Sequence, residues 1–138
     1  MSRWLFLAGG LPFLLLGLAH ALATPLRRDA RRGLSPADPT LEQAMSEARV
    51  RLTGRTNVWL AWVGFNLSHS LGAVCFGFSA LLIGRSDASY ASQAAIFGPA
   101  AIVVAAIYLL LAIRYWFRTP IAGCALSLAL FVGAWLSR

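Results

Sequence analysis

Acidic side chains are scarce in this chain, and its long apolar stretches contain none. The 138 residues include five Asp and Glu, all in polar connecting segments. A transmembrane proton pathway normally uses buried Asp or Glu, and a Ser-His catalytic pair needs an acid to orient its imidazole. The sequence therefore argues against both functions, and no catalytic residue is assigned.

Cysteine and histidine are also scarce. Cys75 and Cys124 lie singly in apolar stretches, and the two histidines are His20 and His69. The spacing fits neither a disulfide framework nor a metal site. A bis-histidine haem needs two imidazoles at similar height on facing helices, whereas counting the helix rise from the span ends separates these two by about 10 Å in depth. The sequence therefore predicts no metal and no cofactor.

Charged residues make up only 12% of the chain and hydrophobic residues 59%. Soluble domains carry about a quarter charged and about half apolar residues, so this composition predicts an integral membrane protein of one domain. The basic residues are twelve arginines without a lysine, and the net charge is +7. Because the arginines gather in connecting segments, they indicate orientation and contact with membrane lipids rather than nucleic acid.

Four apolar stretches are long enough to cross a bilayer. They predict an all-α integral membrane four-helix bundle, with spans at about 4–23, 58–83, 88–117 and 120–136. The first stretch ends in Ala21-Leu22-Ala23, which resembles a signal-peptide cleavage site. Its length and the basic cluster that follows favour a retained span.

Local residues predict where these helices begin, end and bend. Asn57 is expected to cap the start of the second span, and Gly84 its end. Trp59 and Trp62 indicate a membrane interface near that start. The remaining expected caps are Ser86 or Asp87 for the third span and Thr119 for the fourth, and bends are expected at Pro99 and around Gly9, Gly10 and Pro12.

The loop 24–57 is the only long polar stretch. Residues 40–43, Thr-Leu-Glu-Gln, form a capping-box pattern, and Gly54 could end the helix that follows. This predicts a short amphipathic helix lying on the membrane surface. Its apolar positions are Leu41, Met45, Ala48 and Leu52, and the arginines near its C-terminus are Arg49, Arg51 and Arg55.

Nine of the arginines lie in the first and third connections and three on the other side. This asymmetry predicts that the loop 24–57 is cytoplasmic and that both termini are outside. The arginines expected to contact lipid headgroups are Arg27, Arg28, Arg31 and Arg32.

Polar residues lie on one face of the second span. At 100° per residue, Asn66, His69 and Ser70 share an arc with Ala73, Gly77 and Ala80. Bulky residues occupy another arc that is expected to face lipid: Leu60, Val63, Leu67, Leu71, Val74 and Phe78. A third stripe, formed by Gly64, Ser68 and Gly72, is predicted to pack against another helix.

The other spans carry polar groups at comparable depth. Helix-rise counting puts His20 and Cys124 shallow, and His69 and Ser70 near the midplane. A polar pocket in the cytoplasmic half accounts for these groups together, and a small lipophilic or lipid-like ligand demands the least of it. Its predicted lining is Asn66, His69, Ser70, His20, Tyr108 and Ser127.

Two other hypotheses stay open. In one, the chain is an accessory or structural membrane subunit of a homo-oligomer or larger complex, and its polar residues only hold helices together, at about 0.6 kcal/mol each. In the other, the chain is an enzyme that modifies a lipid, against which the lack of buried carboxylates argues.

The run from Trp62 to Gly72, Trp-Val-Gly-Phe-Asn-Leu-Ser-His-Ser-Leu-Gly, resembles the signature of a family of small bacterial four-span membrane proteins without an assigned function. Those proteins place a Gly-Phe-Asn-x-Ser-His-Ser-x-Gly motif in span 2, after a basic cytoplasmic loop. The residues Arg114 to Phe117, followed by Thr119-Pro120, fit the same pattern. The resemblance implies a four-span fold in a bacterial inner (cytoplasmic) membrane, and it is silent on activity.

Overall fold

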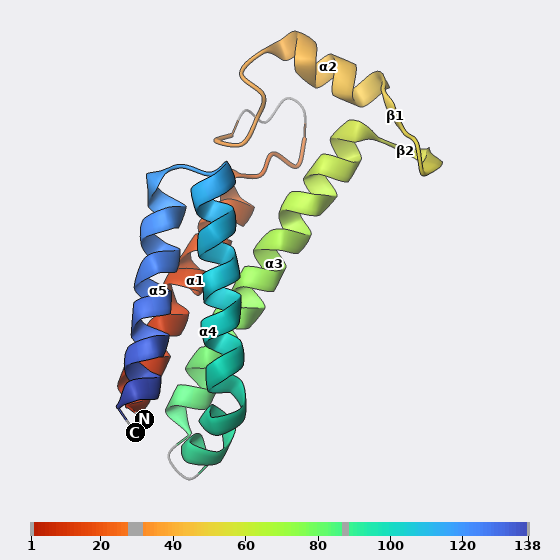
Figure 1. The fold of residues 1–138 in the computed structure, drawn as a ribbon. Coiled ribbons are helices and arrows are strands. Elements are labelled where there is room, and N and C mark those ends of the chain that lie inside the picture. The colour runs from red at the N-terminus through yellow and green to blue at the C-terminus, as the bar shows by residue number, and fades with distance from the viewer. Residues whose placement is uncertain (1, 28–31, 87–88, 138) are drawn as a thin grey trace. The chain divides into compact units, whose positions relative to one another are not determined.

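The computed structural model describes residues 2–27, 32–86 and 89–137, which form five helices and two short strands (Figure 1). Four of these helices are long and apolar enough to cross a membrane, so the chain is a multi-pass membrane protein of mostly helical structure. A short helix lies between the first two spans, as predicted. The elements are α1 (Arg3–Ala23), α2 (Pro39–Glu47), β1 (Arg49–Val50), β2 (Thr53–Asn57), α3 (Val58–Arg85), α4 (Tyr90–Tyr115) and α5 (Arg118–Leu136).

The chain folds as two compact units that share α1 and α3. The bundle unit contains Met1–Leu16 and Ala73–Arg138, and the loop unit contains Gly17–Gly72. The bundle unit thus joins the first half of α1 and the second half of α3 to the hairpin of α4 and α5. The loop unit joins the end of α1 and the start of α3 to α2 and the two strands.

Aromatic rings hold the bundle unit together. The Phe6 ring of α1 lies 5.2 Å from the Phe131 ring of α5 and 6.1 Å from the Tyr90 ring of α4. Two turns further along α1, the Phe13 ring meets the Phe76 ring of α3 edge to face at 4.7 Å. Such pairs add about 0.5–1.5 kcal/mol each beyond the area that they bury. The four helical segments therefore share one aromatic core.

Glycine lets α1 and α3 come close together in the bundle unit. A Cβ atom on Gly77 would lie 2.6 Å from the backbone oxygen of Gly10 and 2.6 Å from the backbone nitrogen of Leu14. A Cβ atom on Gly84 would lie 2.7 Å from the Cβ atom of Leu7. The prediction that Gly84 ends the second span was wrong, because α3 continues to Arg85 and uses Gly84 for this close contact.

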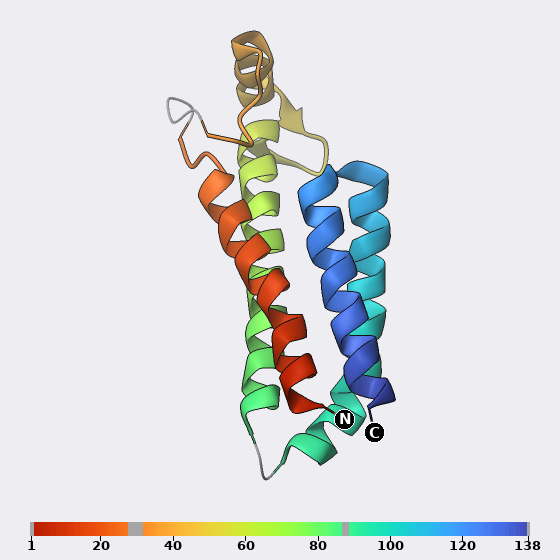
Figure 2. The same cartoon turned by 90° about the vertical axis from the view of Figure 1, so that its left-hand side faces the viewer.

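The helical hairpin of α4 and α5 occurs as predicted, with its caps shifted by a few residues. Phe117, in an extended conformation, precedes α5, so Thr119 lies in the first turn and not at the predicted cap position. Ser89 is the N-cap of α4 without a side-chain cap bond, and the predicted cap Asp87 lies outside the described residues. Pro99 lies within α4, whose first turns run at an angle to the remainder (Figure 2).

In the loop unit, α2 is shorter than the predicted amphipathic helix. It ends at Glu47, and the chain then turns into an antiparallel hairpin of β1 and β2. The residues Val50, Thr53 and Thr56 are β-branched and favour extended backbone over helix. The expected arrangement of Arg49, Arg51 and Arg55 near a helix C-terminus was therefore wrong: Arg49 and Arg55 lie on the strands, and Arg51 lies in the turn between them.

Asp38, not Thr40, caps the N-terminus of α2. Its Oδ1 atom accepts hydrogen bonds of 2.8 Å from both the backbone N–H and the hydroxyl of Thr40, and Pro39 occupies the first helical position. The predicted capping box was therefore placed two residues too late. An aspartate followed by proline is the stronger start signal, since proline already has the helical φ angle and needs no N–H there.

The Asp38 cap should make α2 sensitive to acid. The backbone N–H of Thr40, followed by its hydroxyl, holds the pKa of the Asp38 carboxyl below its ordinary value. Since the folded pKa is the lower one, the cap stabilises α2 above the unfolded pKa of about 3.9 and is lost as pH falls through the folded pKa. An NMR titration of the Thr40 amide proton should therefore have its midpoint below 3.9. The shift should be absent in the control Asp38→Asn, and a midpoint at or above 3.9 would contradict the assignment.

Candidate functional site

The segment after α1 turns back and bonds the last carbonyl groups of that helix. The Arg32 guanidinium donates to the Leu22 carbonyl oxygen over 2.7 Å. The Leu34 backbone N–H donates to the Ala23 carbonyl oxygen over 3.1 Å. The Thr24 hydroxyl donates to the His20 carbonyl oxygen over 2.9 Å. These bonds satisfy helix-end acceptors and place a positive charge at the negative end of the helix dipole. They fix the last turn of α1, which carries His20.

His20 is hydrogen-bonded to Asn66 of α3. Their Nε2 and Oδ1 atoms lie 2.8 Å apart. The amide nitrogen of Asn66 donates to the Trp62 carbonyl oxygen over 2.8 Å, which fixes the orientation of the amide. Its Oδ1 atom can therefore only accept, so His20 donates from Nε2. The bond joins α1 and α3 within the loop unit and selects the Nε2–H tautomer of His20 when that ring is neutral.

The polar face predicted for the second span is buried. Asn66 is 5% exposed and Ser70 is 2% exposed, and the Ser70 hydroxyl donates to the Asn66 carbonyl oxygen over 2.9 Å. Further along the same face, Ala73 and Ala80 are also buried. On the arc expected to face lipid, four side chains are exposed: Leu60, Leu67, Leu71 and Phe78. Helical periodicity therefore assigned the two faces of α3 correctly.

The two histidine rings lie closer together than helix-rise counting indicated. Their centroids are 5.1 Å apart with the rings at 64°, an edge-to-face contact. The estimate of about 10 Å in depth was wrong because it assumed that α1 and α3 end at the same level. His20 is three residues from the end of α1, whereas His69 is eleven residues from the start of α3. The difference of eight residues corresponds to about 12 Å of helix, by which α3 extends beyond the end of α1.

The histidine pair is only partly enclosed. Both rings are half-buried, and the His69 ring also lies nearly parallel to the Phe65 ring, with centroids 6.2 Å apart. Phe65 is 67% exposed. The rings of His20 and His69 are in contact, so this arrangement leaves no gap for a haem between them. It does present two imidazoles, one of them fixed by Asn66, in the apolar part of the spans.

The remaining predicted pocket residues belong to the bundle unit. The Tyr108 ring packs edge to face on Phe13 at 5.1 Å. Ser127 and Cys124 are buried, and the Ser127 hydroxyl has no hydrogen-bond partner among the described residues. That Tyr108 and Ser127 share a ligand with His69 stays a prediction.

The small-residue stripe of α3 faces outward. Gly64, Ser68 and Gly72 are exposed, and a Cβ atom on Gly64 would meet nothing within 4 Å. The Ser68 hydroxyl donates to the Phe65 carbonyl oxygen of its own helix. Packing through this stripe stays a prediction that concerns another protein chain.

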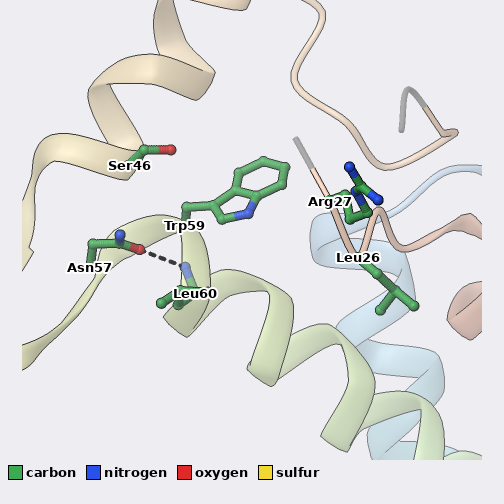
Figure 3. Close-up of a pocket in the computed structure, with 6 residues that line it drawn as sticks. All are labelled: Leu26, Arg27, Ser46, Asn57, Trp59 and Leu60. Carbon is green, nitrogen blue, oxygen red and sulfur yellow. Dashed lines mark hydrogen bonds between the residues drawn. The ribbon is translucent and has the colours of Figure 1, made fainter. Parts of the chain in front are cut away.

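The predicted headgroup arginines fall into three groups. Arg28 and Arg31 lie outside the described residues. Arg32 bonds the end of α1, as described above. Arg27 lines a pocket of about 310 Å³ in the loop unit, together with Leu26, Ser46, Asn57, Trp59 and Leu60 (Figure 3). Sequence reasoning missed this pocket because its lining comes from three separate segments, although Arg27 and Trp59 were each assigned to the membrane interface.

Comparison with known proteins adds no narrower assignment. No protein family model, curated protein sequence or solved structure matches this chain. What identifies it is its architecture: a multi-pass membrane protein with four helices long and apolar enough to be spans.

Proposed function

We propose that this protein binds a small lipophilic or lipid-like molecule through the polar cluster of His20, Asn66 and His69. The observation that supports it is the half-buried imidazole pair, 5.1 Å between centroids, in otherwise apolar helices. Two imidazoles supply both a hydrogen-bond donor and an acceptor. They suit a ligand with a hydroxyl, carbonyl or carboxylate end and an apolar body.

The energetics of polar groups in a membrane favour a role for His69 beyond packing. Ionisable side chains in spans are costly and usually mark functional sites. The hydrogen bond between His20 and Asn66 already joins α1 and α3. The His69 ring lies against the His20 ring and the exposed Phe65 ring, at the half-buried edge of the cluster where a ligand could reach both imidazoles.

The test uses the full chain purified in a mild detergent. We expect native mass spectrometry to detect a co-purifying molecule with the wild-type protein and to lose it with His69→Leu. Ser68→Ala, a change at the exposed neighbouring position, is the matched control and should retain it. Identical profiles for His69→Leu and wild type would overturn the proposal.

A second candidate is favoured by the bonds of Asn66 itself. Its amide joins two helices, and the hydroxyl of Ser70 bonds to Asn66 within α3. The helix-joining bond is expected of an accessory or structural subunit whose polar residues hold helices together. In that case Asn66→Leu would lower stability by about 0.6–1.7 kcal/mol, and His69→Leu would change neither stability nor any bound molecule.

We also propose an orientation for the chain in the membrane and the kind of membrane in which it lies. The excess of arginine in the first and third connections supports the loop 24–57 in the cytoplasm and both termini outside. The resemblance of residues 62–72 to small bacterial four-span proteins supports a bacterial inner membrane. Membrane lipids are then its immediate partners, and association with a second copy or a larger membrane complex would engage the exposed stripe of α3.

A further inference from the structure

One side of the pocket in the loop unit is formed by the buried side chain of Trp59. Trp59 is 4% exposed, and its ring packs on that of Trp62 with centroids 5.5 Å apart. Figure 3 shows Trp59 between Ser46 of α2 and Arg27 of the segment that follows α1. The pocket is thus lined by the buried indole of Trp59 and by the cationic side chain of Arg27.

The helix start beside Trp59 is fixed as well. The Asn57 Oδ1 atom accepts a hydrogen bond of 2.9 Å from the Leu60 backbone N–H, which confirms the predicted N-cap (Figure 3). The amide nitrogen of Asn57 still carries two N–H donors that a ligand in the pocket could use. Asn57, Trp59 and Leu60 all line the pocket, so the start of the 28-residue helix α3, the positive end of its dipole, lies beside it.

The polar lining favours an anion. The guanidinium of Arg27, the indole of Trp59 and the remaining amide group of Asn57 are all donors. Ser46 donates its own proton to the Glu42 carbonyl oxygen. Among the described residues that line the pocket, none carries a carboxylate. Three donors with one positive charge match the oxygens of a phosphate group.

The apolar lining indicates what the phosphate is attached to. Leu26 and Leu60 line the same pocket and are 60% and 56% exposed. Both follow or begin a membrane-spanning helix, at the level where tryptophan and arginine commonly meet lipid headgroups. An acyl chain or glycerol unit would cover these leucines while the phosphate lies against Arg27.

We infer that this pocket binds the phosphate group of an anionic glycerophospholipid, through Arg27, Trp59 and Asn57. The site lies apart from the His20–Asn66–His69 cluster and does not depend on the function proposed for that cluster. Its volume of about 310 Å³ suits a headgroup and not a whole lipid, so the acyl chains would extend along the apolar helices.

The experiment measures lipid affinity of the full chain in an uncharged detergent. Short-chain phosphatidylglycerol, phosphatidylcholine with the same chains, glycerol 3-phosphate and inorganic phosphate are titrated separately, and bound molecules are counted by native mass spectrometry. We expect phosphatidylglycerol to bind more tightly than the other three. Arg27→Gln should weaken phosphatidylglycerol binding by about tenfold.

Matched variants separate this site from general surface charge. Arg51→Gln removes the same charge from an exposed position on the strand hairpin of the same unit, and we expect it to change affinity by less than about twofold. Trp59→Phe keeps a ring in the wall, loses the indole donor and should weaken phosphatidylglycerol binding without affecting phosphatidylcholine. Circular dichroism checks that each variant is folded.

Three results would overturn the inference. Equal losses in Arg27→Gln and Arg51→Gln would assign the effect to net charge. Equal affinity for phosphatidylcholine would remove the requirement for an anion. Equal affinity for glycerol 3-phosphate or inorganic phosphate would make the pocket a site for a free anion instead of a lipid. None of these results bears on whether His69→Leu loses a lipophilic ligand, so the two proposals fail separately.

Discussion

Replacing Gly77 with alanine is expected to destabilise the protein by about 3 kcal/mol, although alanine is the better helix former. The added Cβ atom would lie 2.6 Å from both the Gly10 carbonyl oxygen and the Leu14 backbone nitrogen. These are backbone atoms, so no side-chain rotation can relieve the clash, and α1 and α3 must move apart. Helices in a membrane associate through close packing and not through burial from water, so a wider separation loses much of what holds this pair together.

Gly64 provides the matched control on the same helix. Its Cβ atom would meet nothing within 4 Å, so Gly64→Ala should be neutral or stabilise α3 by up to about 1 kcal/mol through helix propensity. Both variants add one methyl group to α3, and only their surroundings differ. Denaturant unfolding of the two proteins in detergent, followed by circular dichroism, measures the difference. Equal stabilities would mean that α1 and α3 do not approach each other at Gly10 and Gly77.

These two glycines illustrate what sequence periodicity can and cannot predict. The fourfold spacing of Gly64, Ser68 and Gly72 predicted a packing stripe, whereas a Cβ atom would meet the backbone of another helix at 2.6 Å on Gly10 and Gly77. A stripe of small residues shows that a helix can be approached closely. Which glycine is used depends on the residues of the partner helix, and Gly10 lies in α1, far away in the sequence. The pairing is therefore a tertiary property that no single segment encodes.

The membrane spans themselves were predictable to within a few residues, since bilayer thickness sets the length of an apolar run. The start of α3 was correct because Asn57 has a specific capping bond. The end of α2 was not, because Leu41, Met45, Ala48 and Leu52 fit a helical period although the hairpin forms after Glu47. Leu52 is 95% exposed, so no apolar contact extends α2 beyond that point.

In the candidate site too, features of a single helix were predicted correctly and contacts between helices were not. Periodicity assigned Asn66 and Ser70 to a buried face because that argument needs only one helix. The contact between His20 and His69 was missed because it depends on where α1 ends relative to α3. Both the histidine cluster and the pocket at Trp59 lie in the loop unit, whereas the core of the bundle unit consists mostly of alanines and aromatic rings.

The aromatic core of the bundle unit supports a second large effect. Phe131 is 1% exposed, and its ring lies 5.2 Å from that of Phe6 and 5.9 Å from that of Phe76. Truncating a buried phenylalanine to alanine costs about 3–5 kcal/mol through lost contacts and the cavity that remains. We expect Phe131→Ala to fall near the lower end, about 3 kcal/mol, because lipid solvates the exposed apolar surface of the unfolded state.

A double-mutant cycle of Gly9 and Phe131 tests this expectation. A Cβ atom on Gly9 would lie 2.7 Å from the Cε1 atom of Phe131, and the neighbouring rings prevent Phe131 from swinging away. Gly9→Ala alone should therefore destabilise the protein by about 1–3 kcal/mol. In the Phe131→Ala background the clash is gone, and the new methyl group occupies part of the cavity. The double variant should be more stable than the sum of the two single changes predicts, by about 1–2 kcal/mol.

Phe117 supplies the control for this cycle. It is 61% exposed between α4 and α5, so Phe117→Ala removes the same side chain without creating a cavity, and its effect should add to that of Gly9→Ala within about 0.5 kcal/mol. Denaturant unfolding of the single and double variants gives both coupling energies. If the Gly9/Phe131 pair is as additive as the Gly9/Phe117 pair, α1 and α5 are not packed ring against backbone at this position, and the aromatic core must be arranged differently.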